Sequence, residues 1–266
     1  MPPYLAHEDT GATGDTGTGV LPLPLVLVHG HPFDRGMWAP QLAAFSADRR
    51  VVAPDLRGYG ASPVPDDTST PLSVFADDLA ALLDHLDIDR CVLGGVSMGG
   101  QIVMECCARF PGRIAGIVLA DTFPAAETES GRLARAAMAD RLLREGMAGY
   151  AEEVLYKMVA PYADPDVAAH VRRMMTGTDP RGAAAALRGR AVRPDYRPLL
   201  PRITVPALVV VGADDEYTPV AEARAMHEAL PASTLEIIEG AAHLPNLERP
   251  EPFNAALAQW LLRTGL

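Results

Sequence analysis

Short runs of apolar residues, rich in valine, isoleucine and leucine, recur along the chain and predict β-strands. Uninterrupted apolar runs are typical of strands buried on both faces, as in a parallel sheet covered by helices on each side. The predicted strands span residues 25–28, 51–53, 91–94, 114–120, 207–211 and 234–238. A run of small and polar residues, 11–19, predicts a loose turn between two edge strands near the start of the chain.

Helical patterns separate these strands. From Ser73, a predicted N-cap, apolar residues recur at helical spacing and form one face up to Leu86. Further helices are predicted over residues 98–110, 220–230 and 251–262. Strands that alternate with helices imply right-handed crossovers, and we therefore predict an α/β fold with a mostly parallel, doubly wound sheet.

The alternation stops after Asp121, and residues 123–202 carry only helical patterns. Within this segment, two pairs have the form of an N-cap followed by proline at the first helical position: Asp164-Pro165 and Asp179-Pro180. We predict that residues 123–202 form an inserted helical cap over the carboxyl edge of the sheet, where ligands bind in open α/β folds. Residues 1–122 and 203–266 would then form the α/β core.

Length and composition fit a single large globular domain. The chain has 266 residues, 48% of them hydrophobic, and no window approaches the roughly 18 consecutive apolar residues of a membrane-spanning helix. The formal net charge of −11 makes nucleic acid or an anionic membrane a poor partner. The predicted cap holds twelve arginines and one lysine against ten acidic residues, a net +3, and we interpret most of these arginines as solvated.

The cysteines and the N-terminal residues indicate the cellular compartment of the protein. Cys91, Cys106 and Cys107 are an odd number without the spacing of a disulfide framework or a metal site. Residues 1–19 lack the basic and apolar regions of a signal peptide. Reduced thiols without such a signal predict a cytoplasmic protein.

A pentapeptide after the third predicted strand has the form of a nucleophile elbow. Gly95-Val96-Ser97-Met98-Gly99 lies between a strand and the helix that opens at residue 98. Such a turn strains the serine and brings neighbouring backbone too close for a Cβ, so glycines are needed on both sides. The Met98 N–H would then point at the space above Ser97 and stabilise an oxyanion. A closely packed strand end or a phosphate-binding loop is less favoured, because no GK[ST] sequence follows.

Serine needs a base to act as a nucleophile, and among the seven histidines His243 is best placed. It lies on a loop after the last predicted strand, where it can reach the elbow. The third member of a catalytic triad is a carboxylate that orients the imidazole. Asp214 and Asp215 follow the fifth predicted strand and give the chain order serine, aspartate, histidine, whereas Asp121 is a further candidate after the fourth.

The second oxyanion donor is expected in the loop after the first parallel strand, His29-Gly30-His31-Pro32, and we assign it to the backbone N–H of His31. Two histidines at this spacing also occur in metal sites. A tetrahedral site needs a third ligand, which no neighbouring spacing offers, and we therefore predict no metal.

Together these features resemble the α/β-hydrolase superfamily, in the branch with pimeloyl-carrier methyl esterases, 3-oxoadipate enol-lactonases and cofactor-free haloperoxidases. The resemblance rests on five motifs outside the predicted cap: HGHP at 29–32, DLRGYGAS at 55–62, GVSMGG at 95–100, GADDEYTP at 212–219 and HLPNLERP at 243–250. It implies an α/β-hydrolase fold with seven to eight strands. It also implies a set of roles: nucleophile Ser97, base His243, oxyanion donors His31 and Met98, and, by family spacing, the acid Asp215 and not Asp214.

The resemblance implies a serine hydrolase that cleaves a carboxylic ester of a small molecule through an acyl-enzyme on Ser97, without metal or organic cofactor. In related branches the same triad supports enol-lactone hydrolysis, perhydrolysis or haloperoxidation, and C–C bond hydrolysis or lyase chemistry. A non-catalytic binding protein is a further alternative, disfavoured because no triad member is lost. We expect a small ester or lactone as partner, no nucleic acid and no membrane, and a homo-oligomer is possible.

Overall fold

The computed structural model describes residues 5–11 and 22–266. Within these residues seven strands form one sheet in the order β1-β3-β2-β4-β5-β6-β7. The strands are β1 His7–Asp9, β2 Leu25–Val28, β3 Val51–Pro54, β4 Cys91–Val96, β5 Ile114–Ala120, β6 Ala207–Gly212 and β7 Ser233–Ile238. All neighbours are parallel except β1, which runs antiparallel to β3. The predicted α/β fold with a mostly parallel sheet is confirmed.

The hydrophobic pattern predicts the strands well. β2 and β5 have the predicted bounds, and every residue of β2 to β6 is buried, as expected for strands covered on both faces. The turn predicted over residues 11–19 falls almost entirely outside the described residues. Its expected place between two edge strands is wrong, because β2 pairs with both β3 and β4 and so lies inside the sheet.

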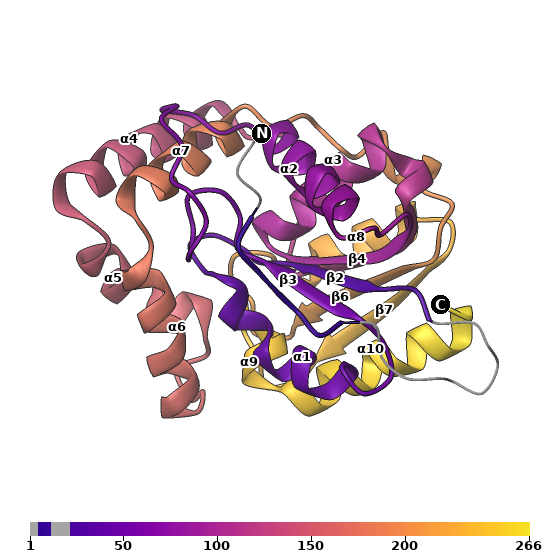
Figure 1. Cartoon of the computed structure of the whole chain (residues 1–266). Helices are drawn as coiled ribbons and strands as arrows, with labels where there is room; N and C mark the ends of the chain where they lie inside the picture. The colour runs from indigo at the N-terminus through magenta and orange to yellow at the C-terminus, as the bar shows by residue number, and fades with distance from the viewer. Residues whose placement is uncertain (1–4, 12–21) are drawn as a thin grey trace.

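Helices cover both faces of the sheet (Figure 1). One face carries α2 Leu72–His85, α3 Met98–Arg109 and α8 Val220–Ala229, and the other carries α1 Ala39–Phe45 and α10 Pro250–Thr264. Three shorter elements complete the core: 3₁₀ helices η1 Arg35–Trp38 and η2 Pro111–Arg113, and helix α9 Pro245–Glu248. A third 3₁₀ helix, η3 Leu200–Arg202, comes before β6. Two hydrophobic clusters, one against each face, form the interior.

The start of α2 differs from the prediction. The helix begins at Leu72, and its cap position is Pro71, not Ser73. Leu72 is 2% exposed and belongs to the same buried cluster as Phe75 and Leu79. Burial of this additional leucine favours an earlier helix start and outweighs capping by the Ser73 hydroxyl.

Four further helices lie between β5 and β6: α4 Glu129–Glu145, α5 Ala148–Met158, α6 Pro165–Gly177 and α7 Pro180–Ala191. We call residues 123–202 the cap. Its helices gather at one end of the sheet, on the left of Figure 1, with α4 against α7 and α5 against α6. Asp164 and Asp179 accept hydrogen bonds from first-turn N–H groups of α6 and α7, so both helices start where the Asp-Pro pairs predict.

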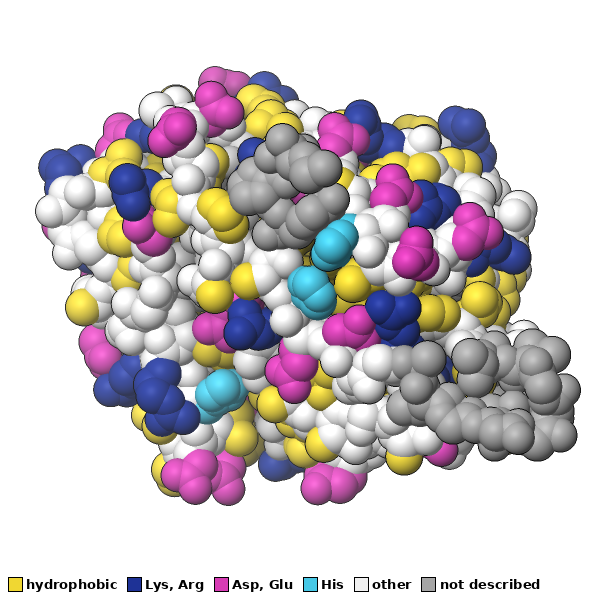
Figure 2. Space-filling view, viewed as in Figure 1, with side chains coloured by type: hydrophobic (Ala, Val, Ile, Leu, Met, Phe, Trp, Pro, Cys, Tyr) yellow, Lys and Arg dark blue, Asp and Glu magenta, His cyan; other side chains and the backbone are white. Residues whose placement is uncertain are grey.

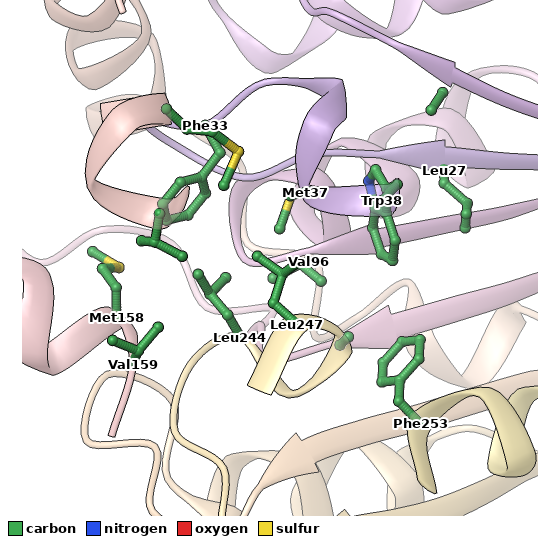
Figure 3. Close-up of a cluster of buried hydrophobic side chains, with 14 of the residues drawn as sticks. Leu27, Phe33, Met37, Trp38, Val96, Met158, Val159, Leu244, Leu247 and Phe253 are labelled. Atoms are coloured by element: carbon green, nitrogen blue, oxygen red, sulfur yellow. The ribbon is translucent and has the colours of Figure 1, made fainter. Parts of the chain in front are cut away.

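The cap packs tightly on the core. Met158 and Val159, at the end of α5, belong to the same hydrophobic cluster as Phe33 and Leu244 of the core, and Figure 3 shows these side chains close together. The same cluster also contains Trp38 of η1 and Phe253 of α10. Full burial of side chains of this size contributes roughly 1.5–3 kcal/mol each, which fixes the cap against the loops beneath it.

Charged side chains of both signs are interspersed over the face of the molecule in Figure 2. Several cap arginines pair with nearby acids, such as Arg188 with Asp140 at 2.6 Å and Arg172 with Glu152 at 3.1 Å. These pairs agree with our interpretation of most cap arginines as surface residues. Among the helices of residues 5–11 and 22–266, none has the length and apolar character needed to cross a membrane.

Candidate active site

The chain turns sharply at Ser97, between the end of β4 and the start of α3. Ser97 has φ 56° and ψ −116°, and non-glycine residues rarely adopt such a positive φ. A Cβ on Gly95 would lie 2.3 Å from the Gly99 carbonyl carbon, and one on Gly99 would lie 2.2 Å from the Val28 oxygen. Neither position accepts a side chain, so the turn has the strand-to-helix geometry of a nucleophile elbow.

Ser97 faces a small cavity between the sheet edge and the cap. The cavity has a volume of about 110 Å³, and His31 and His243 from the core also line it. The cap supplies six lining residues: Phe123, Arg135, Tyr150, Met158, Leu187 and Arg190. Because the cap closes over the turn, Ser97 is only 9% exposed.

A larger cavity, of about 260 Å³, lies at the C-terminal end of α3. Its wall includes Cys107, whose pKa burial raises to about 12, so the thiol stays protonated at neutral pH. The smaller cavity instead combines a strained serine with histidines and arginines. Such groups converge at functional sites, and we therefore take the smaller cavity as the candidate active site.

His243 and Asp215 form a buried, hydrogen-bonded pair in the cavity wall. His243 Nδ1 donates to Asp215 Oδ2 at 2.7 Å. Asp215 also accepts from the Tyr217 backbone N–H at 2.8 Å and from the Thr218 hydroxyl. Burial raises the pKa of Asp215, but the hydrogen bonds from His243 and Thr218 more than offset this and lower it to about 2. An ionised Asp215 holds the imidazole proton on Nδ1 and leaves Nε2 able to accept another.

The neighbouring carboxylate, Asp214, lies outside this pair. Asp214 is exposed and accepts a hydrogen bond from the hydroxyl of Tyr162 in the cap. Of the two adjacent aspartates, it is Asp215 that the structure brings to His243.

A third carboxylate, Asp121, lies beside the pair. Its Oδ1 accepts from the Gly212 N–H at 2.9 Å, whereas its buried Oδ2 has no hydrogen-bond partner in the described part of the chain. One atom each of Asp121, Asp215 and His243 lie within 4.8 Å of one another. Burial raises the pKa of Asp121 well above its usual value, and the negative charge of Asp215 raises it further. This environment favours a neutral carboxyl group at Asp121.

These groups fit a hydrogen-bonded arrangement better than a cation site. A metal needs deprotonated ligands, whereas the raised pKa of Asp121 disfavours its ionised form and Asp215 already accepts three hydrogen bonds. The His-x-His pair fits no better. His29 Nδ1 donates to the Gly30 carbonyl at 2.8 Å and its Nε2 accepts from the Leu56 N–H at 2.9 Å, so both ring nitrogens are already used.

In the described part of the chain, two backbone N–H groups near Ser97 have no hydrogen-bond partner. β2 lies beside β4 in the sheet, which brings the loop after β2 to the elbow. A Cβ on Gly30 in this loop would lie 3.3 Å from Ser97 Cβ. Throughout the described residues, neither the His31 nor the Met98 backbone N–H donates a hydrogen bond. Buried N–H groups are nearly always paired, so two free donors beside a serine match the needs of an oxyanion site.

Sequence reasoning missed Glu248, which supports the loop that carries His243. Its carboxylate accepts from the backbone N–H groups of Ala242 at 2.9 Å and Leu244 at 3.3 Å, on either side of His243. It also accepts from the Ala160 N–H of the cap at 2.7 Å. The HLPNLERP motif contains this glutamate, but only the folded loop shows that its side chain turns back onto the residues before it.

Arg190 is the second residue that sequence reasoning missed. It lies on α7 and reaches the cavity, whereas from the sequence we interpret most arginines of the cap as solvated. Helical spacing carries a signal for its position, because Arg190 follows Ala183 and Ala186 at steps of three and four on a face of small residues. That face is buried, so an arginine on it is buried too.

Comparisons with known proteins agree with this geometry. The sequence matches the Alpha/beta hydrolase family over residues 25–256. It is 33% identical over 230 residues to 3-oxoadipate enol-lactonase 2 of Acinetobacter baylyi, covering 83% of this chain and 82% of that protein. A thermophilic esterase from Thermogutta terrifontis, solved with malate bound, has a TM-score of 0.92 at 38% identity, covering 98% of this chain and 93% of that one. The enol-lactonase from Burkholderia xenovorans has a TM-score of 0.86 at 30% identity, covering 97% and 96%.

We expect Glu248→Ala to destabilise the fold, because it leaves three buried N–H groups without an acceptor. An unpartnered buried donor costs on the order of 1–3 kcal/mol, so the free energy of unfolding should fall by about 3 kcal/mol. Urea unfolding followed by circular dichroism measures this loss. Glu239→Ala, at an exposed glutamate, is the control and should leave the unfolding curve almost unchanged. Equal stability of the two variants would contradict the support assigned to Glu248.

We expect Asp121→Asn to alter how stability depends on pH. The pKa of Asp121 in the folded state lies above its ordinary value of 3.8. The wild type therefore loses stability as pH rises from this ordinary pKa to the pKa of the folded state. Asparagine is neutral at every pH, so the variant does not lose stability through ionisation at this position. The variant should therefore gain stability relative to wild type between about pH 5 and about pH 8. Thermal unfolding at both values tests this, with exposed Asp214→Asn as the control. Parallel pH profiles would show that Asp121 ionises normally.

Proposed function

The chain belongs to the alpha/beta hydrolase family, and we propose that it cleaves a carboxylic ester or lactone of a small molecule through an acyl-enzyme on Ser97. One observation carries the proposal. A serine at a positive-φ turn faces a cavity that also contains the hydrogen-bonded His243–Asp215 pair. The relatives named as esterase and enol-lactonase support ester or lactone hydrolysis as the reaction.

Acylation begins when His243 Nε2 removes the hydroxyl proton of Ser97. The Ser97 oxygen bonds to the carbonyl carbon, and the carbonyl oxygen becomes an oxyanion that accepts hydrogen bonds from the backbone N–H groups of His31 and Met98. Asp215 is ionised and hydrogen-bonded to Nδ1, so it stabilises the imidazolium that forms. The bond to the leaving oxygen then breaks, and His243 returns its proton to the alcohol.

Deacylation repeats these steps with water in place of serine. His243 removes a proton from the water, which attacks the acyl carbon, and the same two N–H groups bind the second oxyanion. The bond to Ser97 breaks, the carboxylic acid leaves, and the serine recovers its proton. For a lactone substrate the acid and the alcohol are two ends of one product. This chemistry calls for no metal or organic cofactor, because residues of the chain handle every proton.

We expect the purified protein to hydrolyse p-nitrophenyl acetate and butyrate in the presence of EDTA. Ser97→Ala removes the nucleophile and should lower kcat by roughly 10⁴-fold or more. A fluorophosphonate probe should label the wild type and not the variant, which identifies the modified serine independently of turnover. Activity that EDTA abolishes, or that survives in Ser97→Ala, would contradict the proposal.

A comparison of Asp215→Asn with Asp214→Asn tests the assignment of the acid. Loss of the Asp215 carboxylate leaves His243 without its partner at Nδ1 and favours the wrong tautomer, so kcat should fall on the order of 10⁴-fold. Asp214 is exposed and accepts a hydrogen bond from the Tyr162 hydroxyl. Asp214→Asn is therefore the matched control, and its kcat should fall only a few-fold. A severe loss in Asp214→Asn alone would assign the acid to the other aspartate. Steady-state kinetics with p-nitrophenyl butyrate distinguishes these outcomes.

A further inference from the structure

The cavity carries two arginines in its wall and no acid. Arg135 on α4 and Arg190 on α7 line it together with Ser97 and His243. Aspartate and glutamate are missing from the described residues that line it. Burial lowers the pKa of His31, and the charges of Arg190 and Arg135 lower it further, so the histidine adds no charge of its own at neutral pH. The two guanidinium groups therefore make the cavity electropositive.

The charges of these two arginines are balanced differently. Arg135 pairs with Glu127, which also accepts from Arg193 at 2.9 Å, so one carboxylate serves two guanidinium groups. Arg190 is only 7% exposed. Its side chain makes one hydrogen bond within the described residues, from Nε to Gln101 Oε1 at 3.2 Å. An uncharged amide does not neutralise a guanidinium, so Arg190 has no counter-ion among residues 5–11 and 22–266.

A buried guanidinium without a counter-ion is costly to the fold. Burial lowers the pKa of Arg190, and the positive charges of Arg135 and Arg193 lower it further, whereas Tyr59 and Tyr150 act in the opposite direction. An anion in the cavity would relieve this cost. The Nη groups of arginine form a planar fork that matches a carboxylate and binds it through two parallel hydrogen bonds.

The backbone of α7 holds Arg190 at a fixed position. A Cβ on Gly189 would lie 1.7 Å from the Thr70 carbonyl oxygen, so this turn of α7 rests directly on the segment before α2. On another side, α7 packs along α4. A site on packed helices is ordered before its ligand arrives, which reduces the entropy lost on binding.

We propose that the substrate carries a carboxylate that binds to Arg190 while its ester or lactone carbonyl lies at Ser97. This inference rests on the proposed function and narrows its substrate to anionic esters or lactones. The small volume of the cavity, about 110 Å³, restricts the acyl part to a short chain. Arg135 is the weaker anchor, because Glu127 already neutralises part of its charge.

Two esters that differ only at the end of the acyl chain test the proposal. p-Nitrophenyl hemiglutarate ends in a carboxylate, and p-nitrophenyl valerate ends in a methyl group at the same chain length. The wild type should have a kcat/KM for the hemiglutarate that is roughly tenfold or more above its kcat/KM for the valerate. We call this quotient of the two kcat/KM values the ratio of the two esters. Arg190→Gln should lower the ratio by roughly 10- to 100-fold, as expected for loss of a charged hydrogen bond. Rates measured with Ser97→Ala correct for uncatalysed hydrolysis of each ester.

Arg181→Gln is the matched control. Arg181 lies on the same helix as Arg190 and is exposed, so its loss changes the net charge equally without touching the cavity. This variant should retain the wild-type ratio of the two esters. Arg190→Lys should give an intermediate ratio, because lysine keeps the charge but not the planar fork. Equal losses of the ratio in Arg181→Gln and Arg190→Gln would attribute the preference to overall charge and overturn the proposal.

Binding of glutarate provides a readout without turnover. Calorimetry should detect glutarate binding to Ser97→Ala and no binding of the neutral diamide glutaramide. It should detect no glutarate binding to the double variant Ser97→Ala/Arg190→Gln. The first measurement leaves Arg190 in place, so it decides the proposal even where Arg190→Gln fails to fold.

The proposal and the proposed function can fail separately. If the wild type hydrolyses both esters with equal kcat/KM and Ser97→Ala binds no glutarate, the carboxylate site is overturned and the hydrolase mechanism stands. If neither ester is hydrolysed and the fluorophosphonate probe does not label Ser97, the proposed function fails. In that case the glutarate measurement still confirms or overturns the anion site at Arg190.

Discussion

The strained backbone at Ser97 is the constraint on which the rest of the site depends. A non-glycine residue at such a φ costs on the order of 1–3 kcal/mol, and it persists only where its surroundings permit no alternative. Here β4 and α3 meet so closely that Gly95 touches Gly99 and Gly99 touches the carbonyl of Val28. The serine side chain is thereby fixed above the sheet edge, and polar side chains that lie beside it come from loops after other strands that end at that edge.

The parallel topology brings those groups together from distant parts of the chain. β2, β6 and β7 end at the same edge as β4, and the loops that follow them carry His31, Asp215 and His243. In sequence these loops lie far apart, so the site exists only in the complete sheet. The same topology explains the environment of Asp121, which follows β5 between β4 and β6 and is buried beside the carboxylate of Asp215.

The sequence predicts the layers of this protein better than its polar contacts. Apolar runs identify the inner strands, because burial on both faces leaves no room for polar residues. The residues alone left Asp121, Asp214 and Asp215 open as the acid, since the direction of each carboxylate depends on turn geometry that no hydrophobic pattern encodes. Family spacing pointed to Asp215, the aspartate that contacts His243 in the structure.

The burial of Arg190 and Glu248 could not be predicted from the sequence for a related reason. Each is a charged residue whose burial follows from tertiary packing, and charged residues in helices and loops are exposed in most proteins. The partners of Glu248 are backbone N–H groups. Every residue except proline has one, so the residue types do not show which N–H groups bind Glu248.

The contact between Glu248 and Ala160 links the cap to the loop of His243. The carboxylate that holds the loop on both sides of the histidine also accepts a hydrogen bond from the end of α5. Lifting this part of the cap would remove one of three donors from a buried anion and weaken its hold on the loop. By linkage, any molecule that holds the cap down also stabilises the loop. One carboxylate therefore joins the position of the cap to that of the loop that carries His243.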